Sequence, residues 1–208
     1  MADDLEDWDK VAQEFGTDKA SKIGYGHGYM EHYEKLLGGR DLRNILEIGV
    51  YLGGSLRMWK KLFPEAKVFG IDNNEYCASL CKREGIQIDI VDAGDMVQLT
   101  EYSANIPMMD LIIDDGSHEE NDVEVAQVIL WDKLVIGGLY VIEDVWIPQR
   151  IDYLKWTGLL GRLRDWAGKM RAGLEIYPDR LAAEWFTNSA VARREAGYSL
   201  MVLRKTEC

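Results

Sequence analysis

The chain of 208 residues is poor in cysteine. Its three cysteines, Cys77, Cys81 and Cys208, are odd in number and lack the paired spacing of metal ligands, so neither a disulfide framework nor a structural zinc site is expected. Cys77 and Cys81 are spaced to share one face of a helix, although buried free thiols are the favoured interpretation.

Long apolar runs and a basic leader are also missing. The longest apolar run, Leu134 to Ile142, is interrupted by glycines and is far shorter than the roughly 20 residues of a membrane span. The N-terminal sequence MADDLEDWDK is acidic and lacks the basic and apolar regions of a secretory signal. We therefore expect a cytoplasmic protein without a membrane partner.

Basic residues are in deficit. The chain has 24 lysines and arginines against 36 aspartates and glutamates, which gives a formal net charge of -12. Affinity for nucleic acid depends on basic side chains that neutralise phosphates, so nucleic acid is not an expected partner.

What the chain does contain is an alternation of strand-like and helix-like runs, with 47% apolar residues to form one core. The predicted strands are 44–50, 67–72, 86–92, 109–115 and 137–144. The predicted helices between them are 54–63, 75–83, 95–102 and 119–134. This order predicts one α/β domain over residues 1–208, with a doubly wound, mostly parallel sheet and helices on both faces.

Both ends of the chain depart from the alternation. Residues 1–40 are expected to form a helical cap, and residues 145–188 a helical insert that packs on the domain, covers the site or contacts a second copy. Residues 190–205 read as two strands around a turn at 195–197, so a C-terminal antiparallel hairpin should complete a seven-stranded sheet.

A glycine-rich loop follows the first predicted strand in the sequence EIGVYLGGSL. Gly49 and Gly53 would let the backbone approach a ligand, Glu47 precedes the loop, and Ser55 lies at the start of the next helix, whose N–H groups are free. Tyr51 stands where the regular dinucleotide motif has its second glycine, which argues against a bound pyrophosphate.

Acids end the next two strands. Asp72 is placed to accept both hydroxyls of a ribose, Asp95 to accept from an adenine amino group, and the Met96 backbone to pair with that ring. A ribose, an adenine and a charged amino-acid tail without phosphates describe S-adenosylmethionine. The alternative is that Asp72 and Asp95 only cap helices.

Four carboxylates and a histidine gather at two further strand ends: Asp114, Asp115, His118, Glu143 and Asp144. Asp114 would lie on the cofactor side. So many carboxylates repel one another unless they are neutralised, and a hard divalent cation, Mg²⁺ before Ca²⁺ or Mn²⁺, would do so. We assign Asp115, Glu143 and Asp144 to the metal; Glu143 and Asp144 can both reach it only if the strand ends between them.

Methyl transfer to a hydroxyl needs that group oriented and deprotonated. A metal that binds two vicinal hydroxyls does both, and the imidazole of His118 is suited to take the proton near neutral pH. Alternatively, His118 is a plain residue at a helix N-terminus and the acids beside it are caps.

These motifs carry a resemblance. ILEIGVYLGGSLRMW, GIDNN, IIDDGSH and GGLYVIED, preceded by FGTDK and GHGYMEHYEKLL, resemble the metal-dependent sugar O-methyltransferases of macrolide and related natural-product biosynthesis. The resemblance implies a class I methyltransferase fold, with Asp115, Glu143 and Asp144 as metal ligands and His118 as general base.

The same resemblance implies a glycoside substrate, with His32 and Tyr33 as candidates for contact with it. Larger relatives carry an N-terminal domain that helps build an oligomer, and we do not expect such a domain within these 208 residues; a homo-oligomer stays open. Two other functions also stay open: methylation of a catechol-like molecule, and a cofactor-binding partner protein without turnover.

Overall fold

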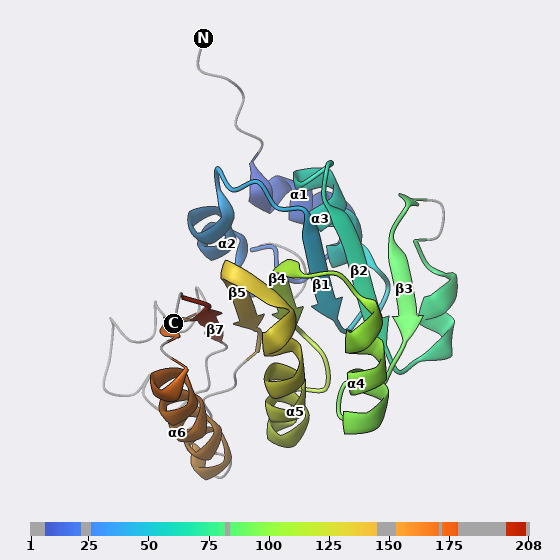
Figure 1. Cartoon of the computed structure of the whole chain (residues 1–208). Coiled ribbons are helices and arrows are strands. Elements are labelled where there is room, and N and C mark those ends of the chain that lie inside the picture. The colour runs from blue at the N-terminus through green and yellow to red at the C-terminus, as the bar shows by residue number, and fades with distance from the viewer. Residues whose placement is uncertain are drawn as a thin grey trace.

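The computed structural model describes residues 7–21, 26–81, 84–144, 153–170, 172–178 and 199–206. Its centre is a seven-stranded sheet in the order β3-β2-β1-β4-β5-β7-β6; Figure 1 labels the part from β3 to β7. The strands are β1 (Asn44–Ile48), β2 (Lys67–Asp72), β3 (Gln87–Ile90), β4 (Met109–Asp114), β5 (Leu134–Ile142), β6 (Gly173–Pro178) and β7 (Ser199–Arg204). Strands β1 to β5 are parallel, and β7 pairs antiparallel with both β5 and β6. The predicted fold class is confirmed.

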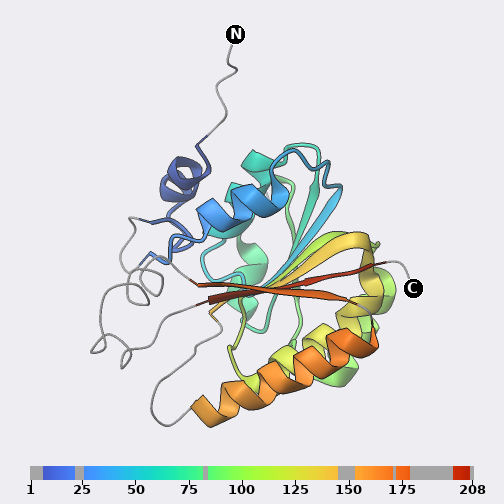
Figure 2. The same ribbon diagram turned by 90° about the vertical axis from the view of Figure 1, so that its left-hand side faces the viewer.

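Helices cover both faces of the sheet, as Figure 2 shows from the side. The helices on one face are α1 (Trp8–Phe15), α2 (Met30–Leu37) and α3 (Gly54–Leu62), and those on the other are α4 (Met96–Asn105), α5 (Glu120–Leu130) and α6 (Tyr153–Lys169). Among the described residues, the short 3-10 helices η1 (Glu75–Ser79) and η3 (Trp131–Lys133) lie in connections.

The two apolar cores follow from the alternation of side chains along the strands. Ile45 packs in the core beneath α1, α2 and α3, whereas its neighbour Leu46 packs in the core beneath α4, α5 and α6. Ile113 and Ile112 divide in the same way on β4. Because helices bury both faces, the central strands are continuous apolar runs.

The C-terminal region differs from the sequence-based expectation. The helix predicted there is present as α6, but residues 173–178 were wrongly included in the helical insert: they form β6 and pair along their whole length with β7. Leu174 and Ile176 have the period of two that suits a strand, and Gly173 and Pro178 bound the run. The first strand and the turn of the predicted hairpin, residues 190–197, lie outside the described residues, whereas β7 lies where its second strand was expected.

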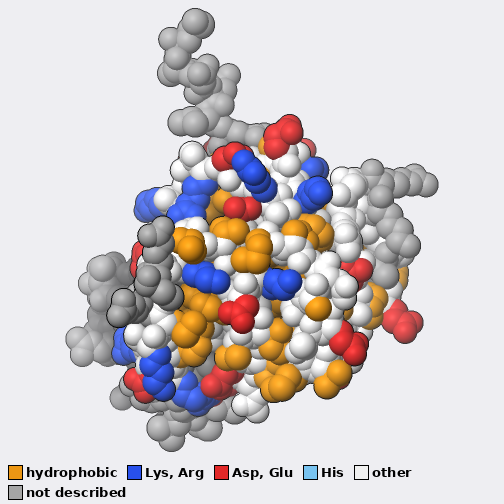
Figure 3. All heavy atoms as spheres, in the orientation of Figure 1, with side chains coloured by type: hydrophobic (Ala, Val, Ile, Leu, Met, Phe, Trp, Pro, Cys, Tyr) orange, Lys and Arg blue, Asp and Glu red, His pale blue; other side chains and the backbone are white. Residues whose placement is uncertain are grey.

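None of the helices in the described ranges combines the length and apolarity needed to cross a membrane. On the face shown in Figure 3, lysine and arginine side chains are interspersed with acidic and apolar ones and do not gather into one patch.

Candidate functional site

A cavity of about 1070 Å³ lies beyond the carboxyl ends of the central strands. It is located where β1 is flanked by β2 on one side and β4 on the other, the point at which the strand order reverses. Its walls come from the loops after β1, β2, β3 and β4 together with the turn after α1: residues 48–52, 71–74, 91–94, 114–118 and 15–18.

Gly49 brings two of these loops into direct contact. Its φ of +89° is unfavourable for other residues, and a Cβ at this position would lie 2.1 Å from the carbonyl oxygen of Asp115. The Gly49 N–H donates to the carbonyl of Ile71, and the Asp115 N–H donates to the carbonyl of Ile48. Gly49 therefore holds the glycine-rich loop after β1 against the acidic loop after β4.

Ser55 and Gly53, which were also predicted to bind the cofactor, differ in their position relative to the cavity. Ser55, in the first turn of α3, is buried and lines the cavity. Gly53 caps α3 with a φ of +75°, lies outside the lining, and contacts the thiol of Cys81, which a Cβ would approach to 2.6 Å.

Asp72 lines the cavity while holding the glycine loop. Its Oδ2 accepts from the N–H groups of Val50 at 2.8 Å and Tyr51 at 3.2 Å. Its Oδ1 accepts from the N–H of Asn74, and Asn74 rather than Asp72 caps the following 3-10 helix. The helix-cap interpretation of Asp72 was therefore wrong, and its carboxylate orders the turn that a cofactor would meet.

Asp95, by contrast, is the N-cap of α4. Its side chain accepts from the N–H groups of Gln98 and Val97, and these hydrogen bonds hold the pKa of Asp95 below its usual value. Asp95 and the exposed Met96 lie outside the lining, whereas Asp92 and Gly94 belong to it. A cofactor contact from Asp95 and Met96 stays a prediction.

Behind the cavity wall, the fully buried Lys19 contacts three carboxylates. Its Nζ lies 2.5 Å from Asp115 Oδ2, 2.7 Å from Glu143 Oε2 and 3.2 Å from Glu47 Oε1. Burial lowers the pKa of Lys19, but the charges of Asp115, Glu143 and Glu47 outweigh this and raise it well above its ordinary value. Lys19 is thus a buried ammonium within an acidic cluster.

Two buried aromatic residues complete this cluster. Tyr33 donates its hydroxyl to Glu143, and Trp59 donates its indole N–H to Glu47 at 3.1 Å. Burial raises the pKa of Glu47 to about 7 and that of Glu143 well above its ordinary value. Neither carboxylate lines the cavity, so a cofactor contact from Glu47 stays a prediction.

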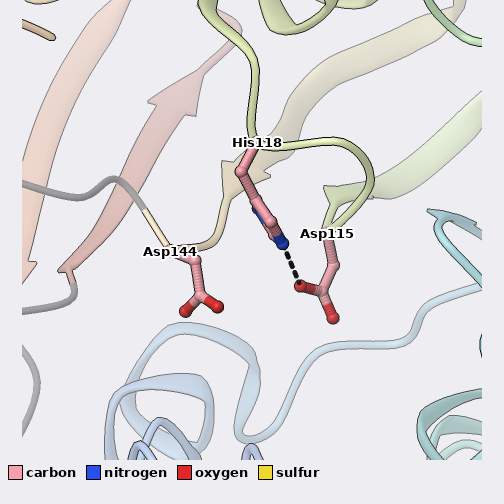
Figure 4. Close-up of side chains that lie close together, drawn as sticks. All are labelled: Asp115, His118 and Asp144. Atoms are coloured by element: carbon pink, nitrogen blue, oxygen red, sulfur yellow. Dashed lines mark ion pairs between the residues drawn. The ribbon is translucent and has the colours of Figure 1, made fainter.

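On the cavity side of the wall, ligand atoms of Asp115, His118 and Asp144 all lie within 4.8 Å of one another; Figure 4 shows this group. His118 Nε2 is 4.0 Å from Asp115 Oδ1. Asp144 Oδ1 accepts from the Tyr29 hydroxyl at 2.7 Å, and Asp144 Oδ2 lies 3.7 Å from His27 Nε2. The three residues present two carboxylates and one imidazole to the same space.

The end of β5 separates the two acids that the sequence analysis assigned to one metal. The strand ends at Ile142, Glu143 donates its N–H to the carbonyl of Asp114, and Asp144 takes a φ of +50°. Asp144 therefore joins the cavity while Glu143 contacts Lys19 and Tyr33 behind the wall. His118 also has a positive φ, +56°; such strain at non-glycine residues concentrates at functional sites.

Other predicted residues have mixed placements. Asp114 is buried, lines the cavity and accepts from the Tyr140 hydroxyl, and burial raises its pKa to about 6. His32 and Tyr33 lie outside the lining, and Tyr33 is fully buried, so their contact with a substrate stays a prediction.

Residues on both sides of the wall could not be singled out from the sequence. Lys19 lies in the FGTDK segment, and Tyr29 and His27 lie in GHGYMEHYEKLL, so these residues belong to motifs that carry the resemblance although none of them was singled out as a site residue. Asp122 had no sequence signal: it reaches the cavity because Gly94 leaves room for it, and a Cβ on Gly94 would lie 2.5 Å from its Oδ1.

The donor set fits a hard divalent cation. The two carboxylates supply the oxygen ligands that hard cations such as Mg²⁺ and Mn²⁺ prefer, and the imidazole of His118 is not needed as a ligand. In the described part of the chain, Lys19 is the one lysine or arginine that forms ion pairs with the acids at this rim, which are Glu47, Asp114, Asp115, Glu143 and Asp144. The local excess of negative charge therefore favours a cation beside Asp115 and Asp144.

Solved structures identify the class of fold. MycE, a methyltransferase of mycinamycin biosynthesis crystallised with Mg and SAH, superposes with a TM-score of 0.69 at 23% identity over 97% of this chain and 55% of its own. TomG of Streptomyces achromogenes with SAM superposes with a TM-score of 0.61 at 13% identity over 94% of this chain and 90% of its own. The chain has the α/β fold of the class I methyltransferases.

Sequence similarity is more particular, although no family model matches the chain. Demethylmacrocin O-methyltransferase of Streptomyces fradiae is 36% identical over 151 residues, which are 67% of this chain and 36% of that protein. Mycinamicin VI 2''-O-methyltransferase of Micromonospora griseorubida is 36% identical over 152 residues, 68% of this chain and 36% of its own length. The sugar O-methyltransferases of macrolide biosynthesis are thus homologues, as the motifs predicted, and the aligned part of this chain spans about a third of their length.

Proposed function

We propose that the protein is an S-adenosylmethionine-dependent, Mg²⁺-assisted O-methyltransferase that acts on a hydroxyl of a sugar or glycosylated natural product. The observation that carries the proposal is that one cavity is shared by the glycine loop, with Asp72, and by the Asp115–His118–Asp144 group. A cofactor on the loop would thereby meet a substrate hydroxyl at the acids.

The cofactor's nucleoside would lie against the loop that Asp72 orders. Both carboxylate oxygens of Asp72 accept hydrogen bonds from backbone N–H groups, and Asp72 also lines the cavity. It therefore shapes the turn and presents hydrogen-bond acceptors to a bound cofactor. Asp92 and Asp122 add further acceptors on the lining. An acidic pocket suits a sulfonium cofactor and opposes a polyphosphate.

Asp115 and Asp144 would hold the metal, whereas Glu143 contacts Lys19 and Tyr33 behind the wall, so its role as a third ligand stays a prediction. When bound, the ion would acidify a hydroxyl that it contacts and fix its orientation. Tyr29 holds Asp144 through its Oδ1, which supports the orientation of that carboxylate from outside the group.

His118 is the base that would accept the hydroxyl proton. Its side chain is 40% exposed, so its ring is reachable from the cavity that it lines, and Nε2 faces Asp115 Oδ1. The leaving thioether departs neutral, so no acid is required opposite the base. The residues of the chain would therefore orient the substrate hydroxyl and accept its proton, while the cofactor would supply the methyl group.

The substrate class rests on the relatives, whose names include the O-methylation of rhamnosyl tetracenomycin-C and of L-olivosyl-oleandolide. Two measurements test the proposal. Calorimetry should show binding of S-adenosylmethionine, and mass spectrometry of reactions with a glycoside panel should show a gain of one methyl group that EDTA abolishes and Mg²⁺ restores. Methylation of catechols alone, or full turnover after rigorous metal removal, would contradict the substrate class or the role of the metal, respectively.

A further inference from the structure

Lys19 is held in place by its backbone as well as by its charge. It lies in the turn after α1, where the Ala20 N–H donates to the carbonyl of Thr17 and the His27 N–H donates to the carbonyl of Asp18. The Lys19 N–H lies 3.4 Å from Thr17 Oγ1. A lysine side chain without solvent exposure, on a turn fixed at several points, has little freedom to leave its carboxylate partners.

Asp115 belongs to both sides of the cavity wall. Its Oδ2 is 2.5 Å from the ammonium of Lys19, and its Oδ1 faces His118. The carboxylate of Asp115 thus connects the buried cluster of Lys19, Glu47 and Glu143 to His118 and Asp144, which share the candidate metal site with it.

The charges of this arrangement do not cancel. When Glu47, Asp115 and Glu143 are all ionised, the one positive charge of Lys19 leaves two negative charges among these four residues before Asp144 is counted. A buried charge acts over several ångströms because the protein interior screens it weakly. Any cation beside Asp115 must therefore be affected by the charge state of Lys19 and Glu47, neither of which lines the cavity.

We propose that Lys19 is the positioning residue of the metal site: its ammonium is a resident cation that fixes Asp115 through Oδ2, engages Glu143, and moderates the affinity for the divalent ion. The inference rests on the proposed function, because it takes the metal site as given. It adds that two cations share Asp115, one built into the chain and one from solution. The metal is bound less tightly than the uncompensated acids would bind it.

A series of charge variants tests this by calorimetric titration of the chelator-stripped protein with Mg²⁺ alone at pH 8. Lys19→Met removes the resident charge and should tighten Mg²⁺ binding by about tenfold or more, because an uncompensated carboxylate set attracts the ion more strongly. Its metal-free melting temperature should fall by about 10 °C or more, because a buried ion cluster loses its cation.

Glu47→Gln changes the charge in the opposite direction and supplies the second arm. It leaves Lys19 and the Trp59 contact in place, so the variant should fold, and it should weaken Mg²⁺ binding by about threefold or more. The control is Lys35→Met, which removes an exposed lysine paired with Glu31 and should leave Mg²⁺ affinity unchanged.

The outcomes are distinguishable. Opposite shifts in Lys19→Met and Glu47→Gln support the inference, and Glu47→Gln decides alone if Lys19→Met fails to fold. Unchanged Mg²⁺ affinity in folded variants of a protein that binds Mg²⁺ would overturn it. Failure of the unaltered protein to bind Mg²⁺ would instead overturn the proposed metal role and this inference with it.

Discussion

Gly49 and Asp115 are so close that a Cβ on the first would lie 2.1 Å from the carbonyl oxygen of the second. The contact couples the loop that would hold the cofactor to the loop that would hold the metal. A change in one loop must therefore displace the other, because backbone atoms on both sides leave no flexible side chain to move.

We expect Gly49→Ala to weaken S-adenosylmethionine and Mg²⁺ binding together, each by about tenfold or more, and to lower the melting temperature. The cause is the clash with Asp115 together with a φ of +89°, which alanine adopts only with strain. Calorimetry and thermal denaturation measure these effects. The control is Gly161→Ala within α6, where a Cβ meets nothing within 4 Å and the helix should be stabilised slightly.

Asp72→Ala should reduce cofactor affinity by at least about tenfold while changing Mg²⁺ affinity little, because the N–H groups of Val50 and Tyr51 lose their acceptor. Asp95→Ala is the matched comparison, since Asp95 accepts from backbone N–H groups in the same way but does so as a helix cap outside the cavity. It should lower the melting temperature slightly and leave cofactor affinity nearly unchanged. A large loss of affinity in Asp95→Ala would instead support a contact with the adenine.

The arrangement of the central strands could be predicted from sequence because periodicity and loop chemistry agree there. Apolar runs such as ILEI and LIID are bounded by glycine or acid, and each lies within a residue or two of an observed strand. Residues 173–178 were misread because the tryptophans, leucines and arginines before them suit a helix, and six residues are too few to show a change of period. Only pairing with β7 reveals them as a strand.

The candidate site was predictable to the level of motifs but not of side-chain direction. Acids at the ends of parallel strands must meet at one edge, which located Asp115 and Asp144 correctly at the cavity. The split between Glu143 and Asp144 depends on the left-handed φ of Asp144, which no local pattern announces. Lys19 could not be placed because it approaches the acids from a turn distant in sequence.

Tyr29→Phe should raise the Mg²⁺ concentration needed for half-maximal methylation by about tenfold, because Asp144 loses the hydroxyl that orients it. Cofactor affinity should not change, since Tyr29 lies outside the cavity lining. Tyr102→Phe is the control: its buried hydroxyl has no hydrogen-bond partner among the described residues. Equal Mg²⁺ requirements in both variants would show that the Tyr29 contact does not position Asp144.

The raised pKa of Glu47 predicts that the free energy of unfolding depends on pH. Burial raises its pKa from 4.5 to about 7, so the folded protein binds a proton that the unfolded chain releases at lower pH. The stability from this group is therefore fully present below about pH 4.5 and is lost as the pH rises through 7. Between these values, Glu47→Gln should reduce the slope of unfolding free energy against pH by up to about 1.4 kcal/mol per pH unit.

Urea denaturation of metal-free protein at pH 5, 6, 7 and 8 measures this slope. Exposed Glu101→Gln is the control and should keep the slope of the unaltered protein. Parallel curves for Glu47→Gln and the unaltered protein would mean that Glu47 is ionised throughout the range and that Lys19 compensates its burial completely.

His118→Asn should lower turnover by about a hundredfold or more, the usual contribution of a general base. Asparagine is chosen because it tolerates the φ of +56° better than most residues, so the loop should keep its shape. The same variant separates the two roles open to this imidazole, which lies within ligand distance of Asp115 and Asp144. A base that does not bind the metal leaves Mg²⁺ affinity nearly unchanged, whereas a ligand loses it together with turnover. Because an asparagine oxygen could itself bind Mg²⁺, His118→Ala should be titrated beside it, and unchanged affinity in both variants assigns His118 to proton transfer.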